Sequence, residues 1–470
     1  MLSRRTLIGL TIGLVALCLC VFAVGLMAAG GMLLYRSVSE APTPAATLRA
    51  TRAATATSAN STPAHTTPQA APTPNPDTLA EMEDIQRWVI EQRGLKPNGP
   101  VERKFLSEAE VLDRTRRDFE EDTTPEEVRD DVRVLALLGL IDPSFDLYDL
   151  YLRLYSEGVA GFYDPDTHEL VVVSNEGQLN AYERTTFAHE YNHALQDQTY
   201  GLRALGFSDE GYDTDPEKAE ALQALLEGDS TLLDEQYQAT FTSAERREYD
   251  QTLDGLDTSV YRETPDFLLR DFFFPYSHGL DFVRRYYAEG GWARVDEVWR
   301  DPPLSSEQIM HPERYESGDN PIQVPRPALT DTLGAGWREI DSSVVGEWYT
   351  YLILAYGVDP GARLSQSAAG NAAAGWGGDS YVAFYHEAQK QTVLALHWQW
   401  DTTQDADEFT RAFQRYADKR FGAADTAGDH VCWESAERHC LYFNGAHTLW
   451  LAAPDQTMLD KVRAEYPDLK

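Results

Sequence analysis

The sequence predicts an α+β fold, and three features lead to that prediction. Residues 80–156 are mostly helical in pattern, and further helical stretches follow up to about residue 320. A short hairpin, ending in Glu169–Val173, interrupts these helices. Beyond a helix expected at Val344–Tyr356, the elements follow in the order strand, strand, helix, strand, strand, helix. Helices and strands grouped in this way are typical of α+β proteins.

The first 36 residues predict a membrane anchor. Two arginines, Arg4 and Arg5, precede an uncharged stretch from Thr6 to Tyr35. A bilayer core needs about 20 helical residues, whereas the apolar part of a signal peptide has about 7–15. The length therefore predicts a single-pass helix, with a cytoplasmic N-terminus and the rest of the chain outside the cell. Cleavage near Ala28–Gly30, which would release a secreted protein, is the alternative.

Residues 37–79 predict a disordered stalk. They are rich in Ala, Thr, Pro and Ser and have almost no large apolar side chains, so they cannot bury enough surface to fold. The folded part is expected to comprise a first domain at 80–325 and a C-terminal α+β domain at 326–470. Within the first domain, a short strand is expected at Val101–Phe105.

The central hairpin is expected just before the most informative helix. Gly158–Asp166 leads through the turn Asp164–Thr167 into the apolar run Glu169–Val173. Asp, Pro and Thr are typical turn residues, and the valines favour a strand. The hairpin is equally compatible with a plain core element.

The pentapeptide His189-Glu190-Tyr191-Asn192-His193 is an H-E-x-x-H motif. On a helix, residues i and i+4 lie on the same face, where two imidazoles can hold one metal ion. Glu190 lies about 100° further round the helix and can reach a metal-bound water. The stretch Ala181–Tyr200 has no Pro or Gly, which predicts one continuous helix. A helix with two exposed histidines and a solvated glutamate is the alternative interpretation.

Catalytic zinc needs a third protein ligand, and Glu227 is the candidate. Asp215 and Pro216 are expected to be the N-cap and first residue of a second helix, which carries an apolar stripe. Glu227 follows two leucines in that helix, and burying a carboxylate there is costly unless a positive group meets it. Gly228, directly after it, would let another helix approach closely. Glu227 could otherwise be a surface residue near a helix kink.

These residues resemble the gluzincin class of zinc metallopeptidases, which have H-E-x-x-H and a downstream Glu-Gly-Asp. The strings HEYNHALQDQ and LLEGDS are also similar to uncharacterised secreted bacterial and archaeal proteins. The resemblance implies a zincin-like fold with one Zn²⁺ bound by His189, His193 and Glu227, and Glu190 as general base. It also implies that an edge strand of the hairpin takes the substrate backbone as an added strand, a binding mode that suits peptides.

The sequence departs from the best-known gluzincins at one position. Some of them have an aspartate four residues after the ligand glutamate to orient a histidine, but here that residue is Thr231. Asp197, at i+4 from His193, and Asp229 are the alternative candidates for that role.

A further donor is needed for the oxyanion, typically a Tyr or His. Tyr276 and His278 are expected near the start of a helix that continues through Tyr287, and His311 and Tyr315 lie in a later segment. Among them, His311 and Tyr276 are the leading candidates. His311, which precedes a proline, could also simply end a helix.

The C-terminal part has two further notable features. Strands are expected at Tyr381–Tyr385, Thr392–Gln399, Leu441–Phe443 and Thr448–Ala453, and helices at about 405–420 and from residue 455. Cys432 and Cys440 lie between two strand-like runs, and outside the cell a disulfide between them is expected.

The charge argues against nucleic acid as a partner. The formal net charge is −36, and its acidic residues are dispersed, so a polyanion would be repelled. The predicted function is therefore a membrane-anchored, extracytoplasmic zinc metallopeptidase acting on peptides or proteins. A catalytically inactive zinc-binding surface module and a zinc amidase of the cell envelope are the alternatives. The sequence indicates no oligomeric state.

Overall fold

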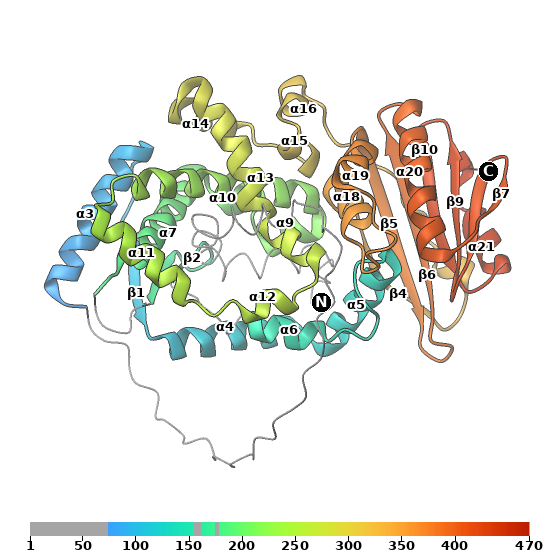
Figure 1. The fold of residues 1–470 in the computed structure, drawn as a ribbon, viewed down its shortest axis with the longest axis horizontal. Helices are drawn as coiled ribbons and strands as arrows, with labels where there is room; N and C mark the ends of the chain where they lie inside the picture. The colour runs from blue at the N-terminus through green and yellow to red at the C-terminus, as the bar shows by residue number, and fades with distance from the viewer. Residues whose placement is uncertain (1–73, 155–160, 174–177, 470) are drawn as a thin grey trace, which may run out of the picture.

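The computed structural model describes residues 74–154, 161–173 and 178–469. It confirms the α+β fold, with a mainly helical N-terminal part and a sheet-rich C-terminal part (Figure 1). The N-terminal part contains α3 (Pro76–Arg93), β1 (Glu102–Leu106), α4 (Glu108–Asp122), α5 (Pro125–Leu138), α6 (Leu147–Leu154), β2 (Gly161–Asp164), β3 (Glu169–Val173), α7 (Ala181–Tyr200), α8 (Leu202–Leu205), α9 (Asp209–Thr214), α10 (Pro216–Gln238), α11 (Ser243–Gly255), α12 (Ser259–Glu263), α13 (Asp266–Gly290), α14 (Trp292–Arg300), α15 (Ser306–Met310) and α16 (Pro312–Ser317).

The expected hairpin forms part of a small sheet with the order β1-β3-β2. Strand β1 pairs with β3 in parallel, and β2 pairs with β3 in antiparallel orientation. The turn closes because Asp164 Oδ1 accepts the backbone N–H groups of Asp166 and Thr167 at 2.9 and 3.2 Å. Within the described residues, β2 is therefore an edge strand of this sheet.

Helices α10 and α13 cross at very short distance in the middle of the N-terminal part. A Cβ atom added at Gly228 of α10 would lie 2.2 Å from the backbone oxygen of Gly279 in α13. In return, a Cβ at Gly279 would lie 2.1 Å from the backbone oxygen of Ala224. The expectation of a close helix approach at Gly228 is confirmed, because only glycine fits at these two positions.

Helix α13 is longer than the sequence suggested. It begins at Asp266, ten residues before Tyr276, and contains Pro275 in its interior. Proline removes one backbone hydrogen bond and normally marks a boundary. Here Phe267, Phe274 and Leu280 are buried along one helix, and this packing outweighs the local preference.

The C-terminal part contains a seven-stranded sheet with the order β4-β5-β6-β10-β9-β8-β7. All of its pairings are antiparallel. Its elements are α17 (Thr330–Leu333), β4 (Trp337–Ser343), α18 (Gly346–Tyr356), α19 (Gln366–Ala373), β5 (Trp376–His386), β6 (Gln391–Trp400), α20 (Thr403–Phe421), β7 (Asp425–Ala427), β8 (His430–Glu434), β9 (Arg438–Asn444), β10 (His447–Ala453), α21 (Gln456–Arg463) and a 3-10 turn (Pro467–Leu469).

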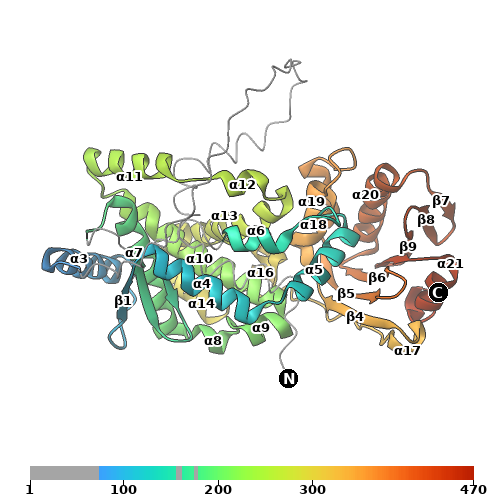
Figure 2. The same ribbon diagram turned by 90° about the horizontal axis from the view of Figure 1, so that it is seen from below.

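Both faces of this sheet are covered by helices. On β6, Leu394 and Leu396 pack with the side chains of α20 in the main core, whereas Val393 and Ala395 pack with those of α21 in a second core. Helices α20 and α21 accordingly lie on opposite sides of the sheet (Figure 2). The alternation follows from the two-residue period of a strand, and it explains why residues 393–396 of β6 form an unbroken apolar run. The main core continues into the helices of the N-terminal part, so the two parts pack against each other.

Two expectations about the wider chain have different outcomes. The disulfide between Cys432 and Cys440 is confirmed and joins directly opposite residues of β8 and β9. The prediction of a single-pass membrane protein is not upheld. In the part of the chain that the structure describes, no helix has both the length and the apolar character needed to cross a bilayer. The predicted anchor at 1–36 and nearly all of the stalk at 37–79 lie outside that part. The membrane location is therefore withdrawn.

Candidate metal centre

The two motif histidines lie on α7, as the sequence predicted. Asn180 caps this helix through a capping box with Glu183, and Gly201 ends it in the left-handed conformation. His189 and His193 are 1% and 4% exposed, and their ring centroids are 4.6 Å apart. The i, i+4 spacing thus places both imidazoles together on a buried face.

Helix α10 brings Glu227 to the same point. Asp215 caps α10 and Pro216 is its first residue, as expected. Glu227 Oε2 lies 3.1 Å from His189 Nε2 and 3.5 Å from His193 Nε2. Three atoms suited to binding zinc therefore converge from α7 and α10. Glu227 lies 34 residues after His193 in the sequence.

Glu190 faces the histidine pair from another side. Its Oε2 accepts the backbone N–H of Tyr163 in β2 at 2.9 Å. Its Oε1 is buried and makes no hydrogen bond within the described residues. Potential ligand atoms of His189, Glu190 and His193 all lie within 4.8 Å of one another. Two carboxylates thus flank the imidazoles, but Glu227 contacts both nitrogens, whereas Glu190 is held by the edge strand.

The outer nitrogen of each ring is fixed by a hydrogen bond. His189 Nδ1 lies 2.7 Å from Asp234 Oδ2. His193 Nδ1 lies 2.8 Å from Gln196 Oε1 and 3.2 Å from Ser230 Oγ. Such contacts orient an imidazole so that its Nε2 faces the centre of a metal site.

Asp229, a predicted orienting carboxylate, is the centre of a buried network. Arg93, at the end of α3, donates to both of its oxygens over 2.8–3.1 Å, and the two side chains are fully buried. Asp229 also accepts from Asn192 Nδ2 at 3.0 Å and from Trp299 Nε1 at 2.9 Å. Asn192 donates in turn to Ser230 Oγ at 2.9 Å, so Asp229 reaches the second histidine through two other side chains.

Asp197, the other candidate, supports the edge strand. Its Oδ2 accepts the hydroxyl of Tyr163 at 2.8 Å and lies 3.0 Å from His168 Nδ1. Its Oδ1 accepts the backbone N–H of Leu202. Asp197 and Glu190 therefore both connect α7 to Tyr163 of β2, the first through its hydroxyl and the second through its backbone N–H.

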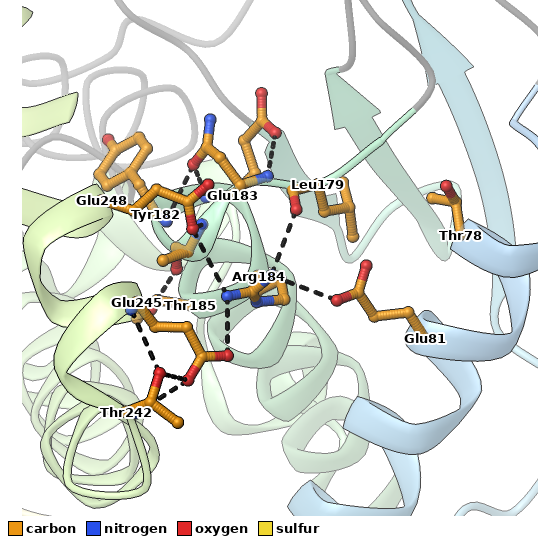
Figure 3. A network of polar contacts seen from close by, with 12 residues as sticks. Thr78, Glu81, Leu179, Tyr182, Glu183, Arg184, Thr185, Thr242, Glu245 and Glu248 are labelled. Atoms are coloured by element: carbon orange, nitrogen blue, oxygen red, sulfur yellow. Dashed lines mark hydrogen bonds and ion pairs between the residues drawn. The ribbon is translucent and has the colours of Figure 1, made fainter.

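The start of α7 is anchored separately. Arg184 pairs with Glu81 of α3 and with Glu245 of α11, each at 3.2 Å, and lies 3.7 Å from Glu248 (Figure 3). The arginine is largely buried, whereas the three glutamates are partly exposed. This network holds α7 between α3 and α11, five residues before His189.

Burial and the neighbouring charges together set the pKa values of Glu190, Glu227 and His193. Burial raises the pKa of Glu190 to about 7, although the two histidines act in the opposite direction. Burial would also raise the pKa of Glu227, but the neighbouring His193 and His189 overcome it and lower that pKa below its usual range. Burial lowers and Glu227 raises the pKa of His193, with a net increase. Glu227 is therefore a carboxylate facing two basic rings.

The two leading candidates for the oxyanion donor, His311 and Tyr276, have described contacts with residues outside the motif. His311 Nε2 is 2.8 Å from Glu347 of α18. Tyr276 is buried in α13 beside Phe272. Neither donor is brought into hydrogen-bonding contact with the motif residues by a described interaction.

The other two residues in these segments also have different neighbours. His278 packs against the rings of Phe274 and Trp348, and burial lowers its pKa to about 4. The hydroxyl of Tyr315 donates to the backbone oxygen of Asp301 at 2.7 Å.

Sequence reasoning missed the residues that hold the rings in place. Asp234 had a usable signal, because it is seven residues after Glu227 and so lies two turns along the same face of α10. Gln196 is three residues after His193 and had the same kind of signal. Arg93, which contacts Asp229 and neither ring, had no such signal, since Asp229 is 136 residues away.

Comparison with known proteins gives one match. The chain matches the model of a family described as a domain of unknown function (DUF8575) over residues 332–463. This segment covers the seven-stranded sheet and helices α18 to α21, and it excludes α7 and α10. No curated protein and no solved structure matches the chain. The candidate metal ligands His189, His193 and Glu227 therefore lie outside the matched segment.

Proposed function

We propose that this chain is a zinc-dependent hydrolase of peptide bonds. One observation carries the proposal. The Nε2 atoms of His189 and His193 both lie within 3.5 Å of Glu227 Oε2, and the Nδ1 atom of each ring has a hydrogen-bonding partner. These outer contacts orient the two rings so that their Nε2 atoms face the same point.

The donor set fits zinc. His189, His193 and Glu227 would hold the ion, since two histidines and a glutamate are an established ligand set for catalytic zinc. The buried His193 Nε2 makes no hydrogen bond within the described residues, which is costly unless another partner meets it. When bound, zinc would lower the pKa of a water molecule and polarise a carbonyl group.

Glu190 is suited to move the proton. The Tyr163 N–H fixes Oε2, which leaves Oε1 to accept a proton from water and return it to the leaving amine. Without a metal ion, burial raises the pKa of this carboxyl to about 7. A bound cation would lower it and favour the ionised form that a base needs.

The edge strand supports peptides as the substrate class. Within the described residues, strand β2 is at the edge of its sheet, but its four residues are buried. The backbone N–H of Tyr163 in this strand donates to Glu190, so an added peptide would have to uncover β2 and pair with its other backbone groups. A peptide that pairs with such an edge is bound through its main chain, independently of its sequence. The negative net charge of the chain argues against nucleic acid.

A second candidate function is zinc binding without hydrolysis, and one observation favours it. His189, Glu190, His193 and Glu227 are between 1% and 4% exposed. A catalytic site needs an open position for water and substrate, whereas a buried centre suits a structural role.

Cleavage of an unfolded protein separates the two candidates. Purified full-length chain is tested for bound zinc and for cleavage of denatured casein, with and without a chelator. We expect Glu190→Gln to keep zinc and lose cleavage, because the ligands remain and the base does not. Glu120→Gln, an exposed position on α4, is the matched control and should retain both. Zinc-loaded wild type that cleaves no peptide bond would support the non-hydrolytic candidate, and wild type without zinc would refute both.

A further inference from the structure

A polar cavity lies where the N-terminal and C-terminal parts of the chain meet, away from the candidate metal ligands. Its volume is about 320 Å³. One wall is the connection between α9 and α10, at 213–217, and another is formed by the ends of β4 and β5. The extended segment 321–326 forms the third wall. This segment is held against β5, because Ile322 N donates to the backbone oxygen of Gly377 at 2.6 Å.

Four carboxylates line this cavity. They are Asp213, Asp215, Glu217 and Asp379. Glu217 and Asp379 are only 4% and 2% exposed. No ion pair to any of the four occurs among residues 74–154, 161–173 and 178–469, and the one cation in the lining, Arg326, is exposed. The cavity therefore has an excess of negative charge.

Buried hydroxyl groups in the same walls lack a protein partner. Ser343 and Ser380 line the cavity and are 8% and 6% exposed. The Oγ atoms of both, and Oδ1 of Asp213, are buried without a hydrogen bond in the described part of the chain. An unsatisfied buried polar group costs about 1–3 kcal/mol, so a bound partner would stabilise the folded protein.

Aromatic and apolar groups complete the lining. The fully buried Trp376 forms part of the wall, together with Pro321, Ile322 and Val344. Indole rings attract cationic groups, and the apolar side chains suit an alkyl chain. The cavity thus combines carboxylates, hydroxyls and an indole, which together complement an organic cation.

We infer that this cavity binds an organic cation with an alkylammonium or guanidinium head group. Asp213 and the free hydroxyls of Ser343 and Ser380 would accept its N–H donors, and its alkyl part would contact Pro321 and Ile322. Asp379 would act through its charge, because both of its oxygens already accept hydrogen bonds. A single metal ion fits less well. The cavity is much larger than an ion, and the only three-residue cluster of ligand atoms found in the described chain is the H-E-x-x-H group.

The pKa values of two buried carboxyl groups in the cavity walls bear on this inference. Burial raises the pKa of Glu217 to about 8, and the nearby Asp379 and Asp215 add to this shift, against hydrogen bonds from Ser306. Burial likewise raises the pKa of Asp379 to about 6. A pKa of about 8 means that Glu217 is mostly protonated near pH 7. A bound cation would favour its charged form, whereas an anion would disfavour it.

Calorimetric titration of the full-length protein tests the inference. Agmatine, which has a guanidinium and an ammonium group on a butyl chain, is the probe, at about 0.15 M salt to screen non-specific attraction. Butanol, acetate and CaCl₂ are titrated in parallel. We expect saturable binding of agmatine alone. A short arginine-containing peptide, titrated in a separate series, distinguishes a free small molecule from a peptide side chain as the source of the head group.

Variants test the location of binding. Asp213→Asn is expected to weaken agmatine binding about tenfold, since it removes a charged acceptor, and the double variant S343A/S380A about fivefold. Asp254→Asn, an exposed position on α11, changes the net charge equally and should have no effect. Circular dichroism confirms that each variant is folded, and the serine variants only remove hydroxyls from the cavity wall.

Four results would overturn the inference. They are no saturable binding of agmatine, binding of Ca²⁺ in its place, equal weakening by Asp254→Asn, and affinity unchanged in both cavity variants. None of them depends on zinc or on peptide cleavage, so the inference stands or falls independently of the proposed function.

Discussion

Replacing Arg93 by methionine is a severe test of the network behind the metal centre. Arg93 is fully buried, and its guanidinium contacts Asp229 at 2.8 Å and Asp296 at 2.7 Å. It also lies 4.5 Å from the ring of Trp292. Burial opposes the charge of Arg93, but Asp229 overcomes that effect and raises its pKa above the usual range. Methionine has a similar stem and no charge, so the variant leaves Asp229 buried without a counterion.

The expected loss of stability is large. Removing one partner of a buried ion pair typically costs about 3–5 kcal/mol, because the remaining charge is desolvated and unpaired. Asp229 is fully buried and would keep only the neutral donors Asn192 and Trp299, so the upper part of this range is expected. An exposed pair is worth about 0–1 kcal/mol, which makes the two cases easy to separate.

Urea denaturation followed by tryptophan fluorescence measures the effect. The matched control is Arg116→Met, since Arg116 pairs with Asp113 at 2.9 Å but both side chains are more than half exposed. The double variant R93M/D229N should be more stable than Arg93→Met alone, because the unpaired charge is removed with its partner.

Two results would refute this reasoning. One is a loss of unfolding free energy for Arg93→Met that is no larger than the loss for Arg116→Met. This would mean that the Arg93–Asp229 pair is accessible to water. The other is a double variant less stable than Arg93→Met, which would mean that packing, and not an unpaired carboxylate, explains the loss.

Three further predictions concern the metal centre, the helix crossing and the cavity. Asp234→Asn should lower zinc affinity about 10–100-fold in a chelator competition, because it weakens the contact that orients the first motif histidine; an unchanged affinity would contradict this role. Gly228→Ala should lower the melting temperature, since its Cβ would lie 2.2 Å from the oxygen of Gly279, at a cost of about 1–3 kcal/mol. Gly255→Ala, with no atom within 4 Å, should not. Burial raises the pKa of Glu217 from 4.5 to about 8, so its protonated form favours folding. The unfolding free energy should then fall as the pH rises from about 4.5 to 8, and Glu217→Gln should reduce this fall in denaturation curves measured across that range.

Local chemistry made several elements of the fold predictable. The limits of α7 and the N-cap of α10 agree with the sequence, because Asn180, Gly201 and Asp215 are strong local signals. Strand β4 was missed, since Trp337–Ser343 contains three charged residues. It forms because β5 provides a partner for it, and no local pattern reports that partner.

The parts of the candidate site differ in the same way. The sequence named the four central residues, and the structure brings His189, His193 and Glu227 into contact. The sequence did not indicate Asp234. It suggested instead that Asp197 or Asp229 orients a motif histidine, whereas both of these carboxylates bond other groups. Any hydrogen-bond acceptor on a neighbouring helix could contact the Nδ1 atom of a histidine. Which acceptor does so depends on how α10 is rotated relative to α7.

The sequence by itself determined which residues could bind a metal, because the spacing of histidines on one helix is a local property. Helix limits and the disulfide pair followed from equally local signals. Only the tertiary structure decided which carboxylates meet those histidines, that the centre is buried, and that Arg93 lies behind it. These features depend on contacts between segments as far as 203 residues apart, and such contacts are set by how the helices pack rather than by any pattern along the chain.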